Sequence, residues 1–155
     1  MAAASLPDTS VFENIIMKLK AQSKQVMEEA AVKRFVCEDG NSVTSLCATV
    51  EQCLRSGLRN RIFGLFGRVS TFALLHKIAP FHQPAATVLQ LTVQSEKRRS
   101  IERRISDSSD PASPKSQYLW IRIALTEKLL AQIVNYVVHN AAARISVSVF
   151  CQLAQ

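Results

Sequence analysis

Apolar residues recur at helical spacing through most of this sequence, and this pattern limits the possible folds more than any other feature. The first such segment opens with Ser10 and Glu13, a spacing at which the hydroxyl and the carboxylate each accept a hydrogen bond from a free backbone N–H. We therefore predict a helix that starts at Ser10 and ends at the "CEDGNS" stretch. The predicted residues of its inward face are Phe12, Ile15, Ile16, Leu19, Val26, Met27 and Ala30.

Further helical segments follow. The second is predicted over 42–59, and the third starts at Ser70 and stops at Pro80. The fourth is predicted over 84–97. A single long helix over 118–140 has the broadest apolar face, so we expect it at the centre of a helical bundle. The predicted fold class is therefore all-α.

The segments outside these helices differ in composition. Residues 98–117 are rich in Ser, Pro and charge and are predicted to form a flexible loop. Residues 1–9 are expected to be disordered. Residues 141–155 form an atypical tail in which "RISVSVF" alternates like a β-strand that has no partner. With 48% hydrophobic and 20% charged residues, the chain has the composition of one globular domain, predicted over residues 10–140.

The sequence indicates an intracellular protein. Its four cysteines include no C-x-x-C pair, and its N-terminus lacks the charged and apolar regions of a secretory signal. The apolar stretch 119–139 is interrupted by Arg122, Glu127, Lys128 and Asn135, which a bilayer centre disfavours. A membrane-spanning helix is therefore not expected.

The sequence contains no motif for catalysis, a cofactor or a metal. His76 and His82 do not have the spacing of a paired helical site, and no H-E-x-x-H, G-x-S-x-G or phosphate-binding G-x-x-x-x-G-K motif occurs. Cys47 and Cys53 fall on or beside the apolar stripe of the second helix, as buried structural cysteines do. We therefore expect no enzyme activity, no cofactor and no metal ligand.

Arg55, Arg59 and Arg61 gather around the end of the second predicted helix. Guanidinium groups pair well with carboxylates, so these arginines are candidates for contact with acidic side chains of a protein partner. The alternative is a solvated charged row in which Glu51, four residues before Arg55, is the local partner. We favour this alternative because surface charge rows are common and contribute little to stability.

The predicted loop carries the densest positive charge in a chain of formal net charge +7. Phosphorylation is one hypothesis, because two arginines precede Ser106 and a proline follows Ser113. Attraction to anionic lipid is the other. The candidate lipid-binding residues are Lys97, Arg98, Arg99, Arg103 and Arg104. Specific nucleic-acid binding is not expected, because the segment has no aromatic side chain to stack on bases.

Two stretches resemble a known family. They are "KQVMEEAAVKRFVCEDGNSVTSLCATVEQCLRSGLRNR" and, later, "YLWIRIALTEKLLAQIVNYVVHN". Both are similar to the N-terminal RUN domain of the small G protein signaling modulators, which combine a RUN domain with a TBC domain. The resemblance extends over residues 11–140 and rests on the order of "MEEA", "F-V-C-E-D", "C-x-x-V-E-x-C-L" and "W-I-R-x-A-L-x-E-K".

The resemblance implies a helical, noncatalytic adaptor for small GTPases of the Rab or Rap type in vesicle-mediated membrane traffic. It also implies a cytoplasmic protein on Golgi, endosomal or vesicle membranes. These 155 residues contain no TBC region, so the GTPase-activating chemistry of that domain is not expected of them.

A RUN domain would continue into further helices, whereas "AAARISVSVFCQLAQ" lacks their pattern. We therefore expect a bundle that is incomplete at its C-terminus, with part of the Leu119–Val138 helix uncovered. Two alternatives to the adaptor function follow. One is a truncated regulatory or nonfunctional isoform that self-associates through this helix, and the other is a basic module that binds membrane surfaces.

Overall fold

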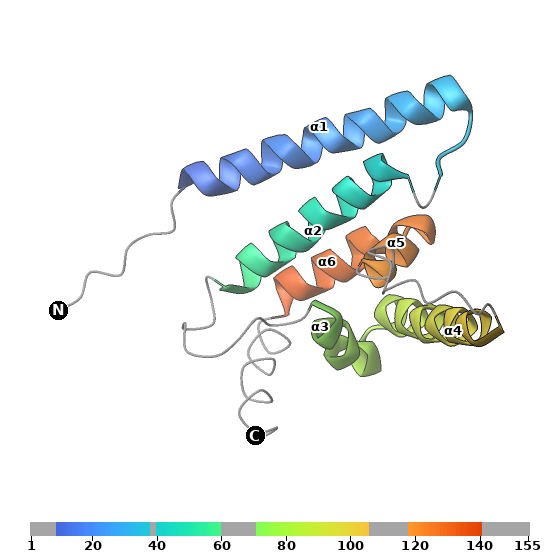
Figure 1. Ribbon diagram of the computed structural model, residues 1–155. Coiled ribbons are helices and arrows are strands. Elements are labelled where there is room, and N and C mark those ends of the chain that lie inside the picture. The colour runs from blue at the N-terminus through green and yellow to red at the C-terminus, as the bar shows by residue number, and fades with distance from the viewer. Residues whose placement is uncertain (1–8, 38–39, 60–70, 106–117, 141–155) are drawn as a thin grey trace. The chain divides into compact units, whose positions relative to one another are not determined.

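The computed structural model describes residues 9–37, 40–59, 71–105 and 118–140, and every regular element in these ranges is a helix (Figure 1). In chain order they are α1 (Thr9–Lys33), α2 (Asn41–Arg59), α3 (Thr71–Ile78), the 3-10 helix η1 (Ala79–Phe81), α4 (Gln83–Ile105), α5 (Leu119–Thr126) and α6 (Leu130–His139). The all-α prediction is confirmed. None of the described helices is both long and apolar enough to cross a bilayer. The predicted tail and residues 1–8 of the predicted disordered N-terminus lie outside the described residues.

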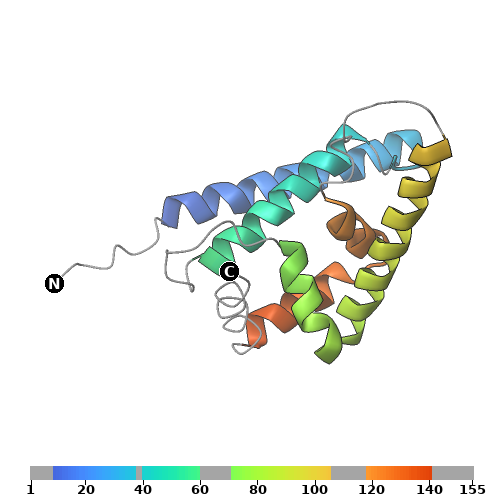
Figure 2. The same ribbon diagram turned by 60° about the horizontal axis from the view of Figure 1, so that its bottom comes forward.

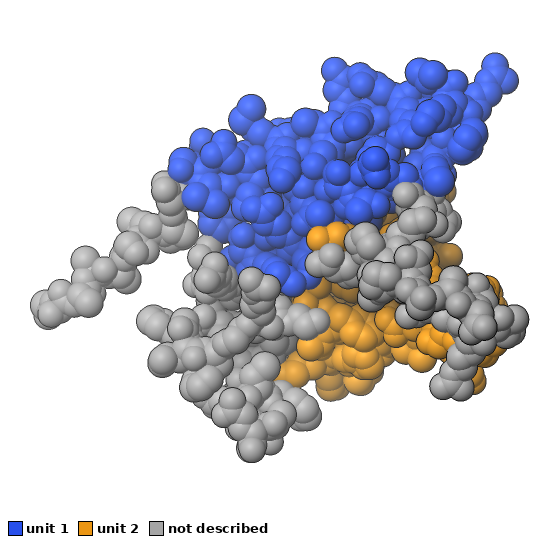
Figure 3. All heavy atoms as spheres, in the orientation of Figure 1, with its two compact units in different colours: residues 1–63 blue, residues 64–155 orange. Residues whose placement is uncertain are grey.

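The chain divides into two compact units, which Figure 3 colours separately. Unit 1, Met1–Phe63, contains α1 and α2, and unit 2, Gly64–Gln155, contains the other helices. Each unit has its own packing: α1 packs on α2 in unit 1, and α3, α5 and α6 pack on α4 in unit 2. The domain predicted over residues 10–140 therefore contains two units.

Unit 1 contains a pair of long helices, α1 and α2 (Figure 1). On α2, Val43, Cys47 and Val50 recur at i, i+4 and i+7 and are all buried, as their helical spacing predicts. Among the described side chains of α1, only Ile15 is buried to the same degree. The apolar stripe of α2 is therefore broader than the buried strip of α1.

Two residues that we predicted on the inward face of α1 are exposed. Ile16 and Met27 lie toward the margin of the face that carries Ile15, and both face solvent. This part of the prediction is wrong because α1 has a single helical neighbour in unit 1, which covers only a narrow strip of its surface.

Residues 34–37 and 40 are the described part of the connection between α1 and α2. Arg34, directly after α1, has a φ of 59°, the left-handed conformation that commonly ends a helix. Gly40 donates its N–H to the carbonyl of Cys37 at 2.9 Å, and a Cβ at position 40 would lie 3.0 Å from that same oxygen. Glycine suits position 40 because the backbone approaches it closely.

Unit 2 is built around α4. Helices α3, α5 and α6 lie on one side of α4 in both Figure 1 and Figure 2. The buried apolar residues of unit 2 are Leu74, Leu75, Ile78, Ala85, Val88, Leu119, Trp120, Ile121, Ala124, Ile133 and Val137. The packed side of α4 therefore faces its three partners, and its opposite side is left uncovered by them.

Helix α4 is longer than we predicted. It continues through Ile105, so residues 98–105, which we predicted as the start of a flexible loop, are helical. The loop prediction rested on low apolar content, which indicates that a segment is not buried but does not prevent it from forming a helix. Lys, Arg and Glu are good helix formers, and no Gly or Pro interrupts them here. The hydroxyl of Ser100 also donates to the carbonyl of Glu96 at 2.9 Å within the helix.

The long final helix that we predicted over 118–140 is two helices. Helix α5 ends in a Schellman motif, in which Leu129 donates its N–H to the carbonyl of Ala124 at 2.8 Å. In the same motif Lys128 donates to the carbonyl of Leu125 at 3.1 Å. Lys128 has a φ of 59°, the conformation that glycine usually adopts at this position. The single-helix prediction is wrong because neither Gly nor Pro marks the break.

The structure also describes the exposure of residues 119–138. We predicted that part of an apolar helix over Leu119–Val138 would be uncovered, with self-association through it as one alternative. The structure buries some of its apolar residues and leaves others half-buried. The buried ones are Leu119, Trp120, Ile121, Ala124, Ile133 and Val137, and the half-buried ones include Ile123, Leu125, Leu129, Leu130 and Val134. Val138 remains 55% exposed. Part of the apolar surface that self-association would use is thus covered, and self-association stays a prediction.

Candidate interaction surfaces

Arg55 is the predicted arginine contact whose side chain the structure describes. Its guanidinium lies 2.8 Å from a carboxylate oxygen of Glu51, one helical turn earlier. This ion pair agrees with the alternative interpretation of the sequence, in which Arg55 belongs to a solvated charged row and pairs with Glu51. Arg59 lies in α2 with its side chain outside the described part, and Arg61 lies outside the described residues. The gathering of the three arginines therefore lies partly outside the described residues and stays a prediction.

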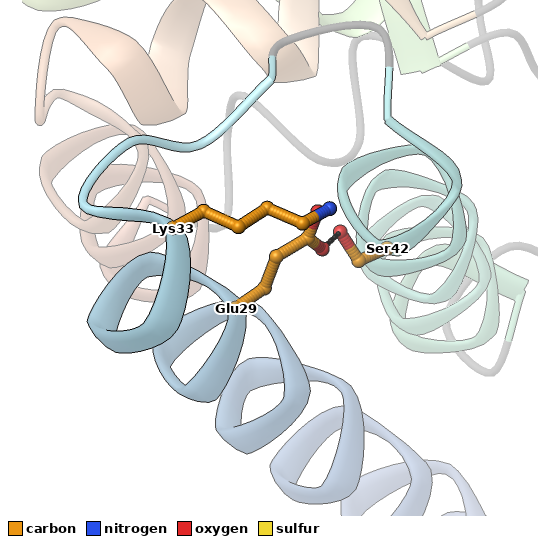
Figure 4. A network of polar contacts seen from close by, with 3 residues as sticks. All are labelled: Glu29, Lys33 and Ser42. Atoms are coloured by element: carbon orange, nitrogen blue, oxygen red, sulfur yellow. Dashed lines mark hydrogen bonds and ion pairs between the residues drawn. The ribbon is translucent and has the colours of Figure 1, made fainter.

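Glu29 ties the end of α1 to the start of α2 (Figure 4). One of its carboxylate oxygens accepts a hydrogen bond from Lys33 Nζ at 2.7 Å, and the other accepts one from Ser42 Oγ at 2.5 Å. The hydrogen bond from Lys33, followed by that from Ser42, lowers the pKa of the Glu29 carboxyl. The hydrogen bond between Lys33 and Glu29 also raises the pKa of Lys33. Side chains thus fasten the two helix ends between which the chain turns.

This fastened turn displays apolar side chains to solvent. Val32, Phe35 and Val36 are all exposed, Phe35 by 64%. They flank the exposed cations Lys33 and Arg34, which are adjacent in the sequence. We refer to these residues, 32–36, as the turn surface. Phenylalanine and arginine are among the residues enriched in protein–protein interfaces, so this exposed group is a candidate protein-binding surface.

Sequence reasoning missed the turn surface as a site. Phe35 and Val36 contributed to the family resemblance, but helical periodicity ends at this point and so predicts nothing about which side chains face solvent. The available signal was a pair of large apolar residues, Phe35 and Val36, two and three positions after the last residue of α1. A residue in that position commonly packs back on its helix, and here both are exposed instead.

A second exposed surface lies on α4. Val93, Lys97 and Ile101 follow one another at spacings of four and so form one row along the helix. Val93 is 48% exposed and Ile101 is 50% exposed, whereas Val88, on the packed side of α4, is fully buried. Arg98 is exposed beside this row. We refer to Val93, Lys97, Arg98 and Ile101 as the α4 face.

The charges around this row are unequally distributed. Lys97 and Arg98 are exposed, and neither forms an ion pair within the described ranges. Arg99 is half-buried and has an interaction of its own. Glu96 precedes Lys97 by one residue and Glu102 follows Ile101 by one, so each acid lies about 100° around the helix from the row. The row itself therefore carries apolar and cationic groups only.

The remaining residues of the predicted lipid and phosphorylation sites are less fully described. Arg103 and Arg104 lie in α4, with their side chains outside the described part. Ser106 and Ser113 lie outside the described residues, so phosphorylation there stays a prediction. The segment that would carry cations to a membrane is thus the end of a helix, and not the loop that we predicted.

His82 stacks on Tyr136, with ring centroids 4.4 Å apart and an interplanar angle of 25°. Its Nδ1 is buried and has no hydrogen-bond partner among the described residues. Burial lowers the pKa of this imidazole. His76 instead contacts Phe72 edge-on at 4.8 Å. Within the described ranges, no group of three His, Cys, Asp or Glu residues is placed to hold a metal ion.

Comparison with known families identifies the kind of domain to which this chain belongs. The RUN domain family model matches residues 45–146, a range that begins within α2 and includes α3 to α6. The chain belongs to the RUN domain family. The α4 face lies inside the matched residues of this RUN domain, and the turn surface lies before them.

The RUN domain has relatives in small G protein signalling. It is 32% identical to human Small G protein signaling modulator 1 over 152 residues, covering 90% of this chain and 13% of that protein. It is 34% identical to Rab GTPase-activating protein tbc-8 of Caenorhabditis elegans over 132 residues, covering 85% of this chain and 13% of that protein. It is 31% identical to mouse Small G protein signaling modulator 2 over 150 residues, covering 87% of this chain and 15% of that protein.

The chain thus spans 13% to 15% of the length of these relatives. No solved structure matches it. The family predicted from the ordered motifs of the sequence, the RUN domain of the small G protein signaling modulators, is confirmed.

Proposed function

We propose that this chain is a noncatalytic adaptor that binds a small GTPase of the Rab or Rap type. The turn surface carries the proposal, because it exposes a phenylalanine, two valines and two cations in one short stretch. The relatives support it, since their names place two of them in small G protein signalling and attach one to Rab GTPases.

Phe35 is the proposed anchor of the interface. A partner that covers this ring removes a large apolar area from water, and buried aromatic anchors contribute most of the binding free energy in many interfaces. Arg34 lies beside it and is exposed. Its guanidinium can pair with an acidic side chain of the GTPase, which sets the orientation of the partner and raises the association rate.

The contact between Glu29 and Ser42 gives this surface a defined shape before binding. It fastens both ends of the turn, so less conformational freedom is lost when a partner docks. The proposed adaptor acts in the cytoplasm, where a Rab or Rap partner recruits it to Golgi, endosomal or vesicle membranes in vesicle traffic.

The test is a binding measurement by biolayer interferometry with purified Rab and Rap GTPases, each loaded with GDP or with a non-hydrolysable GTP analogue. The chain should bind at least one of them with a preference for one nucleotide state. Phe35→Ala should weaken that binding about tenfold or more. Phe81→Ala is the matched control, because Phe81 is 78% exposed in η1 of unit 2 and should leave binding unchanged.

Other outcomes overturn parts of the proposal. Equal losses for Phe35→Ala and Phe81→Ala would remove the turn surface as the contact. A loss on Arg55→Glu alone would move the contact to the arginines around the end of α2. Failure of the folded chain to bind any GTPase of the panel in either nucleotide state would overturn the adaptor function itself.

A further inference from the structure

We propose that the α4 face docks the RUN domain on an anionic lipid surface. Val93 and Ile101 enter the headgroup region, while Lys97 and Arg98 contact the negatively charged headgroups. This inference goes beyond the binding of a GTPase and does not depend on it, because it uses a different helix in a different unit.

The packing of unit 2 leaves this face uncovered. Helices α3, α5 and α6 all lie on one side of α4 (Figure 2). Val88 and Thr92 point to that side and are buried. The row of Val93, Lys97 and Ile101 runs along the other side and is exposed over two helical turns. A helix with such a row can lie flat on a membrane without disturbing the packing beneath it.

The charge of the face matches an anionic surface. Lys97 and Arg98 form no ion pair with any described residue, so no bond within that part of the protein must break before they contact a headgroup. The acids Glu96 and Glu102 are rotated away from the row. Each cation near an anionic bilayer increases binding about fivefold, and this effect falls with ionic strength.

A lipid surface fits the α4 face better than a protein partner does. Protein hot spots are enriched in Trp, Tyr and Arg seated in defined pockets. The apolar residues of this face are two aliphatic side chains separated by Lys97, and neither is aromatic. A fluid headgroup layer accepts such scattered side chains without requiring a complementary pocket.

The experiment is flotation of the 155-residue chain with vesicles of phosphatidylcholine alone and of phosphatidylcholine mixed with phosphatidylserine. The chain should float with the mixed vesicles only, and less so as salt is raised. The double variant K97E/R98E should bind the mixed vesicles about 25-fold more weakly or worse. The variant K18E/K20E changes the net charge equally at two exposed lysines of α1 and should bind as the unaltered chain does.

A second pair of variants tests the apolar side chains. V93S/I101S should weaken vesicle binding, whereas V11S/I16S should not, although Val11 and Ile16 are exposed on α1 to the same degree as Val93 and Ile101. Circular dichroism of every variant checks that the helices are retained. Phe35→Ala should float normally, which separates this proposal from GTPase binding.

Three results would overturn the proposal. The first is no flotation with the mixed vesicles. The second is equal loss in K97E/R98E and K18E/K20E, which would mean that only net charge matters. The third is loss of GTPase binding in K97E/R98E with vesicle binding unchanged, which would assign the α4 face to an acidic protein surface.

Discussion

The indole Nε1 of Trp120 donates a hydrogen bond to Oγ1 of Thr71 over 3.2 Å, although the two residues are 49 positions apart in the chain. Both residues are buried. The bond joins the start of α5 to the start of α3 inside unit 2. A buried N–H that loses its partner costs more free energy than the hydrogen bond contributes, so this contact favours one arrangement of the two helices.

Trp120→Phe should lower the free energy of unfolding by more than the lost hydrogen bond alone, about 1 kcal/mol, because it also removes buried apolar area. Urea denaturation followed by circular dichroism measures this. The hydrogen bond itself is isolated by a double-mutant cycle with Thr71→Val. Single changes whose effects simply add would show that the two side chains are not coupled.

Lys128→Gly should stabilise the chain by about 1 kcal/mol, because Lys128 adopts the left-handed backbone conformation that costs free energy for any residue with a Cβ. A rise in the thermal midpoint of about 2 to 4 °C checks this. Lys128→Ala is the control: it removes the same charged side chain but keeps the Cβ. A rise for alanine equal to that for glycine would contradict the backbone explanation.

Unit 1 should lose stability in acid through Glu29. The pKa of this carboxyl is lower in the folded chain than its ordinary value of 4.5, so the folded state binds fewer protons. The stability it contributes is present above pH 4.5 and is lost as the pH falls through the lowered folded value. Urea denaturation across this range should show a weaker pH dependence for Glu29→Gln than for the unaltered chain.

Glu28→Gln provides the comparison for Glu29. Glu28 lies on the same helix, and its ion pair with Lys24, at 3.6 Å, is largely exposed. The change should therefore have little effect on stability. If both variants altered the pH dependence equally, the hydrogen bonds that Glu29 accepts from Lys33 and Ser42 would not be the cause.

Unit 2 should lose stability at mildly acidic pH through His82. Burial lowers the pKa of its imidazole below the ordinary 6.5, so the unfolded chain binds more protons than the folded chain. The neutral ring is favoured above pH 6.5, and stability falls as the pH drops from 6.5 toward the lowered folded value. His82→Phe keeps a ring to stack on Tyr136 and should remove this pH dependence.

Thermal melts at several pH values measure the effect of His82, and a two-dimensional NMR titration follows the ring directly. His76→Phe is the control, because His76 is exposed and contacts only Phe72 among the aromatic rings of the described residues. A pH dependence that survives in His82→Phe would have to come from another group.

Local pattern was enough to predict several elements. The capping spacing of Ser10 and Glu13 indicated the start of α1 to within one residue, and the row of Val43, Cys47 and Val50 indicated the buried stripe of α2. The pair of Glu51 and Arg55 at i, i+4 likewise indicated the ion pair that the structure contains. These features depend on neighbours one or two helical turns away, so the sequence records them directly.

The sites were less predictable than the helices. The α4 face was predicted as a basic cluster, but its geometry as a row with Val93 and Ile101 depends on α4 continuing through Ile105. The turn surface was not predicted at all. Phe35 is exposed because no part of the chain that the structure describes covers its ring, and helical periodicity carries no information about that. Arg122 shows the reverse case: a charged residue that the sequence marks as polar is buried in α5.

The sequence by itself determined that this chain is helical, where most of its helices lie, and through its ordered motifs which family it belongs to. Only the tertiary structure decided that Ile16 and Met27 face solvent, that the last helix breaks at Lys128, and that side chains 49 positions apart meet at Thr71 and Trp120. The physical reason is that helical periodicity is a property of adjacent turns, whereas burial and helix breaks without Gly or Pro depend on packing partners distant in sequence.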